Sequence, residues 1–230
     1  LATEKGLQLV ADAQYVFAGP GSPSYALRQW SGTPLAGLLI KKLRSGGIVT
    51  FASAAALTLG KYTLPVYEIY KAGEPPRWLD GLDILSELGI KAALIPHYNN
   101  AEGGHHDTRF CYLGEHRLAM LEEQLPADAH VIGVDEHTGV ILDLDSNTAT
   151  VIGNSTITVR IKGRSTIHNS GDVISIDALR DPATGATNIP IQVIPPNTLQ
   201  AEPAKESTSL ANDTQQAEQA FNDAISSGDA

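Results

Sequence analysis

Hydrophobic and polar positions alternate along the first two-thirds of the chain between patterns typical of strands and patterns typical of helices. Residues 35–45 carry leucines at helical spacing and end in Lys and Arg, which suit the negative end of a helix dipole. Short apolar runs that resemble strands lie between such helical segments. The expected strands are residues 14–18, 48–51, 92–95 and 130–134; the expected helices are residues 35–45, 79–88 and 117–125, with a helix start at 52–56.

From residue 139 onward the pattern changes to short alternating runs separated by turn signals, which predicts antiparallel hairpins. The combined pattern predicts an α/β fold over residues 1–180. We expect a three-layer sandwich with a mostly parallel sheet, followed by C-terminal antiparallel β hairpins. The expected hairpin strands are residues 139–143, 148–152, 156–162 and 172–176.

The last fifty residues differ in composition from the rest of the chain. Residues 181–188 resemble a turn region, and from about Pro195 the chain is rich in Ser, Asn, Gln, Ala and acids, with few large apolar side chains. Such a composition buries too little apolar surface to offset the entropy of ordering. We therefore expect 181–230 to be a linker and a disordered acidic tail.

Charge and apolar content narrow the classes of partner. The formal net charge of -10 argues against nucleic acid, because phosphates favour a basic face. The longest apolar run, residues 48–59, is shorter than the roughly 20 residues needed to cross a bilayer, so we expect no membrane span. The single cysteine, Cys111, excludes an intrachain disulfide and favours a reducing, cytoplasmic location.

A strand that runs directly into a tight turn at Ser53 is the strongest local signal. Small residues follow it, as in a nucleophile elbow, where the turn lifts a hydroxyl above the sheet edge. The N–H of Ala54 would be one oxyanion donor, and the glycine-rich loop at Gly21 could supply a second. The alternative is a serine that only caps a helix.

Two further strands are followed by ionisable residues. His97 follows the strand 92–95, and Asp135 and Glu136 follow the strand 130–134. An imidazole can take a proton from a serine hydroxyl, and a carboxylate can hold that imidazole in the required tautomer. A loop histidine and a solvated turn are the alternatives. The residues alone leave the choice between Asp135 and Glu136 open.

The order of these three strand ends resembles the peptidase E and cyanophycinase family of serine peptidases, whose fold is like that of class I glutamine amidotransferases. The matching segments are Phe51-Ala52-Ser53-Ala54-Ala55, Pro96-His97-Tyr98 and Gly133-Val134-Asp135-Glu136, with a glycine-rich loop at Gly19-Pro20-Gly21-Ser22. The resemblance covers about residues 14–176. It implies a Ser53–His97–Glu136 triad, with Glu136 at the position of the family's acid.

The chain departs from the family pattern at the elbow and at the N-terminus. Phe51 and Ala55 replace the family's elbow glycines, and the sheet's usual first strand is not evident before Gln14. The first departure favours a catalytically silent binding or scaffold protein of the same fold as an alternative. The second leads us to expect a truncated N-terminus.

The loop after His97 holds other polar candidates. We expect Arg109 and Asn99 to contact substrate. A guanidinium at Arg109 suits the carboxylate of an Asp-containing peptide, in line with the resemblance, although a surface ion pair is equally compatible. The run from Glu102 to Asp107 contains possible metal ligands but lacks the rigid spacing of a metal motif, so we expect no metal. Cys111 is expected to be a buried small side chain.

These observations predict a serine-type hydrolase that cleaves an amide or peptide bond through an acyl-enzyme and needs no cofactor. The predicted partner is a peptide or small amide, and a homodimer is left open. A metal-dependent hydrolase that uses His97, His105 and His106 is a third hypothesis.

Overall fold

The computed structural model of the protein describes residues 2–182, which belong to one compact unit. The expected linker and acidic tail therefore lie outside the described residues, apart from residues 181 and 182. None of the helices in the described part is both long and apolar enough to cross a membrane.

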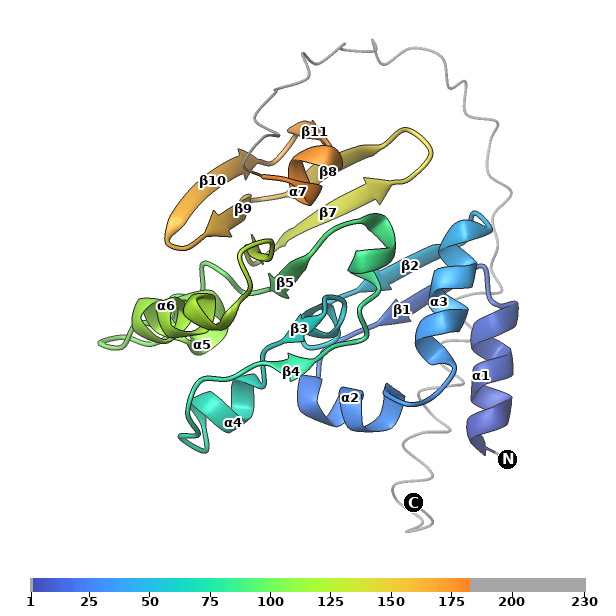
Figure 1. Cartoon of the computed structure of the whole chain (residues 1–230), viewed down its shortest axis with the longest axis horizontal. Coiled ribbons are helices and arrows are strands. Elements are labelled where there is room, and N and C mark those ends of the chain that lie inside the picture. The colour runs from blue at the N-terminus through green and yellow to red at the C-terminus, as the bar shows by residue number, and fades with distance from the viewer. Residues whose placement is uncertain (1, 183–230) are drawn as a thin grey trace, which may run out of the picture. The chain divides into compact units, whose positions relative to one another are not determined.

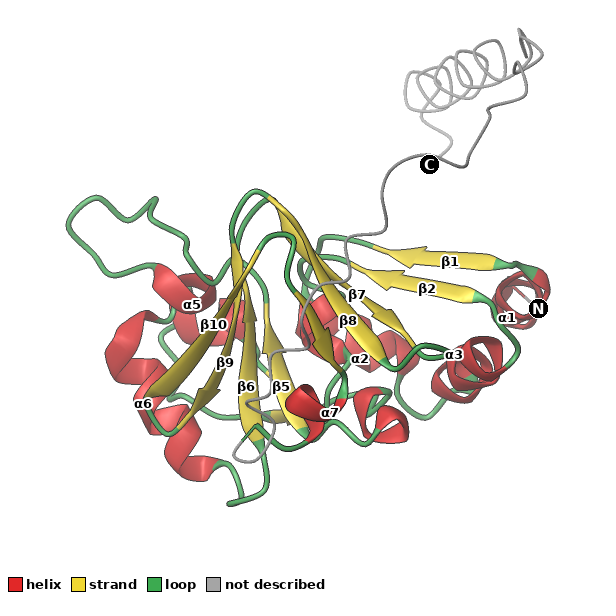
Figure 2. Ribbon diagram, turned by 90° about the horizontal axis from the view of Figure 1, so that it is seen from above, coloured by secondary structure: helices red, strands yellow, loops and turns green. Residues whose placement is uncertain are grey.

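A two-stranded parallel sheet and three helices form the N-terminal part (Figures 1 and 2). Val16, Val49 and Phe51 turn one face of the sheet toward a core that the helices share. The opposite face is open, because Tyr15, Phe17 and Ile48 are all more than half exposed. The elements are α1 (Ala2–Asp12), β1 (Tyr15–Ala18), α2 (Pro23–Trp30), α3 (Leu35–Arg44) and β2 (Ile48–Phe51).

A four-stranded sheet of order β10-β9-β6-β5 forms the second part. Only β5 and β6 run parallel, and β9 and β10 continue the sheet as an antiparallel hairpin. Figure 2 shows α5 and α6 on one side of this sheet. The elements are β5 (Ala92–Ile95), α5 (Arg109–Tyr112), α6 (Gly114–Gln124), β6 (His130–Val134), β9 (Thr156–Ile161) and β10 (Arg164–Asn169).

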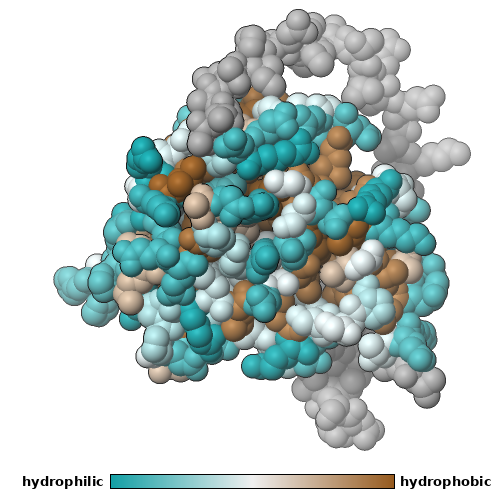
Figure 3. All heavy atoms as spheres, viewed as in Figure 1, coloured by the Kyte–Doolittle hydropathy of each residue, from teal (hydrophilic) through white to brown (hydrophobic). Residues whose placement is uncertain are grey.

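The other face of that sheet packs against a three-stranded antiparallel sheet of order β11-β8-β7. Helix, sheet and sheet therefore form three layers in this part of the molecule (Figure 2). Apolar side chains remain at the surface here, among them Ile141 and Ile152. Figure 3 shows brown, apolar areas on the face of the molecule that it presents. The elements are β7 (Thr138–Asp143), β8 (Thr148–Gly153), β11 (Val173–Ser175) and α7 (Asp177–Arg180).

Short elements connect β2 to β5. They are the 3₁₀ helix η1 (Ala56–Thr58), β3 (Tyr62–Thr63), α4 (Val66–Tyr70), β4 (Leu79–Asp80) and the 3₁₀ helix η2 (Leu85–Leu88), with β3 and β4 paired antiparallel. This connection passes directly against β5. A Cβ on Gly60 would lie 2.1 Å from the carbonyl oxygen of Ala92, so only glycine fits there.

The strand pairing differs from the mostly parallel sheet that the sequence predicts. Among the described strands, only the β1–β2 and β5–β6 ladders are parallel, and the other ladders are antiparallel. No ladder joins β2 to β5 in the described residues, and the chain after Ser53 packs against β5. The mixed α/β class is confirmed; the mostly parallel sheet is not what the strands form.

Several elements also differ from expectation. The helix expected at 79–88 is instead β4 and η2, separated by Asp83 in a left-handed conformation with φ of 58°. The helix start expected at 52–56 is a tight turn leading into η1. The helices α1 and α2 and the strand β10 were not expected at all.

Candidate active site

Ser53 lies in a sharp turn just beyond β2. Its φ is 51°, a left-handed conformation that costs a residue with a side chain about 1–2 kcal/mol. The Ala52 N–H donates to the Ala18 carbonyl at 2.8 Å, and the Ala55 N–H donates to the Gly19 carbonyl at 3.3 Å. The turn is thus tied to the loop after β1, and it has the strained backbone that is typical of a nucleophile elbow.

The two residues that replace glycine at the elbow leave the turn intact. The Phe51 ring packs edge-on against Trp30, with 6.1 Å between ring centroids, and belongs to the core beneath α2 and α3. Ala55 has a φ of -65°, which any L-residue adopts without strain. Neither position therefore requires glycine in this structure.

His97 follows β5 and faces both Ser53 and Glu136. Its Nε2 lies 2.9 Å from Ser53 Oγ, and its Nδ1 lies 3.1 Å from Glu136 Oε1. The side chains of His97 and Glu136 are 38% and 32% exposed, so solvent and small molecules can reach the pair. His97, like Ser53, has a φ of 51°.

Glu136, the second residue after β6, is held as a carboxylate by two neighbours. Asn100 Nδ2 donates to its Oε1 at 3.0 Å, and this bond, together with the contact to His97, lowers the pKa of Glu136 below its usual value. The Glu136 N–H donates to Asn99 Oδ1 at 2.8 Å. A charge is thus available beside Nδ1, where it favours the tautomer that leaves Nε2 free to accept a proton.

Asp135, the other carboxylate considered for this role, contacts different groups. It is buried and accepts hydrogen bonds from Ser155 Oγ and from the N–H and Oγ1 of Thr156. Asp135 therefore joins the end of β6 to the start of β9, while Glu136 contacts the imidazole.

Asn100 is a site residue that the sequence did not single out. Its side chain is almost fully buried, at 1% exposure, and its Nδ2 contacts the Glu136 carboxylate. Its Oδ1 accepts the Glu102 N–H at 3.3 Å, and Glu102 in turn accepts the Tyr112 hydroxyl at 2.6 Å. The adjacent pair Asn99-Asn100 after Pro96-His97 was the available signal.

The two expected oxyanion donors lie in the elbow and in the loop after β1. Among the described residues, no hydrogen-bond acceptor is found for the Ala54 N–H. Gly21 has a φ of 149°, a conformation that side chains rarely allow, and a Cβ there would meet nothing within 4 Å. Next to it, Ser22 caps α2 by accepting the Tyr25 N–H at 3.2 Å.

Among the described residues, no hydrogen bond joins the side chain of Arg109 or Cys111 to Ser53 or His97. Arg109 is held by Asp107, with Nε–Oδ1 and Nη2–Oδ2 distances of 2.8 Å each. Cys111 is buried, and burial raises the pKa of its thiol to about 12, so it stays protonated. Within residues 2–182 no group of three or more His, Cys, Asp or Glu side chains is placed to hold a metal ion.

A surface pocket of about 600 Å³ opens beside the loop that follows His97. Three of its side chains carry or can carry positive charge, and two are tyrosines whose rings lie 5.0 Å apart. Its lining consists of Tyr70, Lys71, His106, Asp107, Thr108, Tyr112 and Arg117.

No profile of a known protein family and no curated protein matches the chain. Among solved structures, a peptidase from an acI-B1 Actinobacterium matches with a TM-score of 0.58 and 22% identity, over 75% of this chain and 63% of that one. A "Putative Peptidase E Protein" from Listeria monocytogenes EGD-e matches with a TM-score of 0.43 and 10% identity, over 73% and 65% of the two chains. The chain thus spans about 63% of the length of the actinobacterial peptidase, and it has a peptidase-like fold.

Proposed function

We propose that this protein is a serine-type hydrolase that cleaves an amide or peptide bond, and that it is related to the peptidase E and cyanophycinase group. The observation that supports this most directly is the hydrogen-bonded series from Ser53 through His97 to Glu136, with steps of 2.9 and 3.1 Å. Both distances suit proton transfer and orientation of the base. The peptidase-like fold is consistent with the proposal.

The geometry suits covalent catalysis. Ser53 Oγ attacks the substrate carbonyl as its proton passes to His97 Nε2, and the Glu136 carboxylate stabilises the resulting imidazolium. The N–H of Ala54, with a second donor from the loop at Gly21, would hold the oxyanion. His97 then protonates the leaving amine, and a water molecule, activated by the same imidazole, releases the acyl group from Ser53.

We propose an acidic substrate, such as an Asp-containing peptide. The pocket beside the His97 loop supports this, because its lining holds Lys71, His106 and Arg117 in a protein whose overall charge is -10. The one acid in the lining, Asp107, is paired with Arg109. Tyr112 on its wall bonds to Glu102, and Glu102 is linked through Asn100 to Glu136. Arg109 remains a predicted substrate contact, although Asp107 holds it here.

A fluorophosphonate probe tests the nucleophile directly, because it labels a serine that a neighbouring base activates. We expect labelling of the wild-type protein, its loss in Ser53→Ala and its retention in the control Ser165→Ala, whose side chain is exposed on β10. The readout is intact-protein mass spectrometry. Absence of labelling in folded wild-type protein would contradict the proposal and favour a catalytically silent binding protein of the same fold.

A further inference from the structure

A left-handed turn supports the strand end that carries His97. It lies within α5, and its residues Phe110, Cys111 and Tyr112 have positive φ values of 60°, 56° and 68°. Left-handed residues with side chains are individually unfavourable, so three in succession persist only where surrounding contacts over-determine them. The next glycine, Gly114, also has positive φ, at 72°.

This turn presents two consecutive N–H groups to the proposed base and its neighbour. The Phe110 N–H donates to the Tyr98 carbonyl at 2.8 Å, and the Cys111 N–H donates to the His97 carbonyl at 3.1 Å. His97 is itself in a left-handed conformation and depends on such contacts. The turn therefore fixes the backbone from which the imidazole reaches Ser53.

The ring of Phe110 connects the turn to the rest of the molecule. It is buried and packs against the Tyr98 ring, with 4.5 Å between centroids. The guanidinium carbons of Arg109 and Arg160 lie 4.9 and 5.4 Å from its centroid. Both separations fall within the range in which a cation attracts an aromatic ring.

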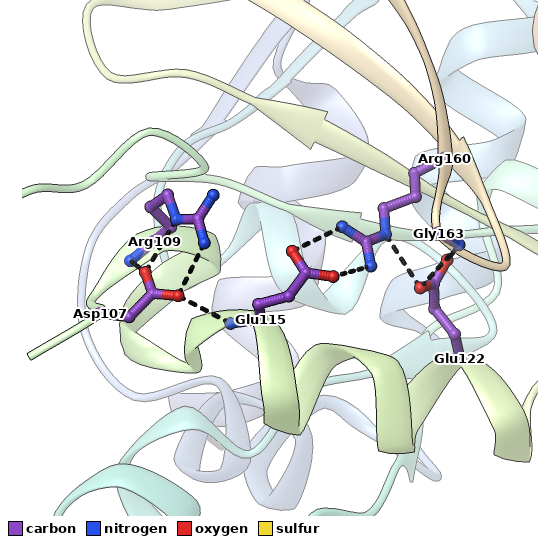
Figure 4. Close-up of polar contacts among 6 residues, drawn as sticks. All are labelled: Asp107, Arg109, Glu115, Glu122, Arg160 and Gly163. Atoms are coloured by element: carbon purple, nitrogen blue, oxygen red, sulfur yellow. Dashed lines mark hydrogen bonds and ion pairs between the residues drawn. The ribbon is translucent and has the colours of Figure 1, made fainter.

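Arg160, on β9, is a buried cation held by two carboxylates of α6. Its side chain is 5% exposed, its Nε donates to Glu122 Oε2 at 2.9 Å, and its Nη1 donates to Glu115 Oε2 at 3.1 Å. Glu122 also accepts the Gly163 N–H at 3.2 Å, as Figure 4 shows. Desolvation offsets much of the attraction within a buried ion pair, so stability alone is a weak reason for such a cluster.

The same cluster continues to the other cation beside Phe110. The Glu115 N–H donates to Asp107 Oδ2 at 2.9 Å, and Asp107 holds Arg109 (Figure 4). The carboxylates thus fix both guanidinium groups that lie against the Phe110 ring.

We propose that Arg160 is a positioning residue for His97, which it holds in place through Phe110 and the left-handed turn. The effect on reactivity rests on the proposed function, whereas the effect on the turn can be measured without it. Through Arg160, the C-terminal hairpin β9–β10 would set the geometry of a site whose reacting groups lie elsewhere.

The test variant replaces the buried charges together, because Arg160→Met alone would leave Glu115 and Glu122 unpaired and could unfold the protein. In Glu115→Gln/Glu122→Gln/Arg160→Met, we expect the Phe110 and Cys111 amides to exchange with solvent at least about tenfold faster by NMR. Fluorophosphonate labelling of Ser53 should slow by about tenfold or more, because small misplacements of a reacting group have effects of this size.

Arg180→Met is the matched control. Arg180 also makes several hydrogen bonds, to Leu88, Asn147 and Asp177, but these lie away from the triad. We expect exchange of the Phe110 and Cys111 amides and labelling of Ser53 to change less than about twofold in this control. Adding Phe110→Leu to the triple variant should cause little further loss, because both act through one connection.

Unchanged exchange of both amides in a folded triple variant would overturn the proposal. Faster amide exchange with unchanged labelling of Ser53 would overturn it as well. A wild-type protein that does not label would contradict the proposed function instead, and amide exchange would still decide the role of Arg160. If the triple variant does not fold, Arg160→Lys takes its place, because lysine keeps the cation but loses the planar guanidinium. We again expect faster exchange of the Phe110 and Cys111 amides and slower labelling of Ser53.

Discussion

Ser53 and His97 share an unusual backbone conformation, with φ of 51° at both residues. Each side chain is thereby turned toward the other at the end of its strand, and their polar atoms meet at 2.9 Å. Strain of this kind is common where a fold places reactive groups, and it is sustained by contacts elsewhere. The free energy of unfolding should therefore respond to replacements at these positions according to backbone preference.

Replacing Ser53 by Gly or by Ala separates strain from loss of the hydroxyl. Both variants lack Oγ, but only glycine adopts a positive φ without steric cost. We expect Ser53→Gly to be more stable than Ser53→Ala by about 1 kcal/mol, measured by urea unfolding. Equal stability, or a more stable alanine variant, would show that the turn is not strained at this residue.

The neighbouring carboxylates Asp135 and Glu136 should differ in what their loss affects. Glu136→Gln should slow fluorophosphonate labelling by about 10³-fold or more, because Gln cannot stabilise an imidazolium as a carboxylate does. Asp135→Asn should mainly lower stability, because buried Asp135 accepts three hydrogen bonds. The reverse pattern would assign the carboxylate role to Asp135.

The lowered pKa of Glu136 adds a pH dependence to that comparison. A carboxyl group with a depressed folded-state pKa stabilises the fold above its ordinary pKa of 4.5, and this contribution is lost as the pH falls further. The stability difference between wild type and Glu136→Gln should therefore shrink below about pH 4.5 in urea titrations. A difference that stays constant down to pH 2.5 would contradict this.

At the scale of elements, the sequence predicted those whose signals are local. The strands 92–95 and 130–134 have the expected bounds, because each is a short apolar run that is buried in the sheet. The helix α2 was missed, although Ser22 followed by Pro23 is a recognised helix-start signal. The prediction of a helix at residues 79–88 was wrong. The leucine spacing there suits a helix, but Gly81 lies against the backbone of Gly60.

Two glycines with opposite surroundings test this account of packing. A Cβ on Gly81 would lie 1.9 Å from the Gly60 carbonyl oxygen, whereas a Cβ on Gly37, inside α3, would meet nothing within 4 Å. We expect Gly81→Ala to lower stability by about 1–3 kcal/mol. Gly37→Ala should raise it by about 0.5–1 kcal/mol, because alanine is the better helix former. Thermal unfolding followed by circular dichroism measures both; a tolerated Gly81→Ala would mean that the β4 connection moves freely.

At the scale of the whole molecule, strand pairing was the least predictable feature. Individual strands could be read from the sequence, but pairing partners depend on contacts between distant segments. The chain after Ser53 packs against β5, and the hairpin β9–β10 extends the sheet beyond β6. The parallel pairing expected from alternating elements is therefore present only in β1–β2 and β5–β6 among the described strands. Ser53 and His97 could be named because they follow strand ends, and the family resemblance selected Glu136 over Asp135. Asn100 had only its place beside Asn99 as a signal, and Arg160 lies against Phe110 through a tertiary contact that no local pattern records.

The elbow without glycines has a consequence for how such sites are found. At Ser53 the turn keeps its shape because the Phe51 ring lies in a separate core and Ala55 has an ordinary φ. A search that demands fixed glycines on both sides of a serine would overlook chains of this kind. Screening structures for a left-handed serine directly after a parallel strand, with an imidazole within reach, would find them, and would extend the set of candidate hydrolases beyond those that sequence motifs define.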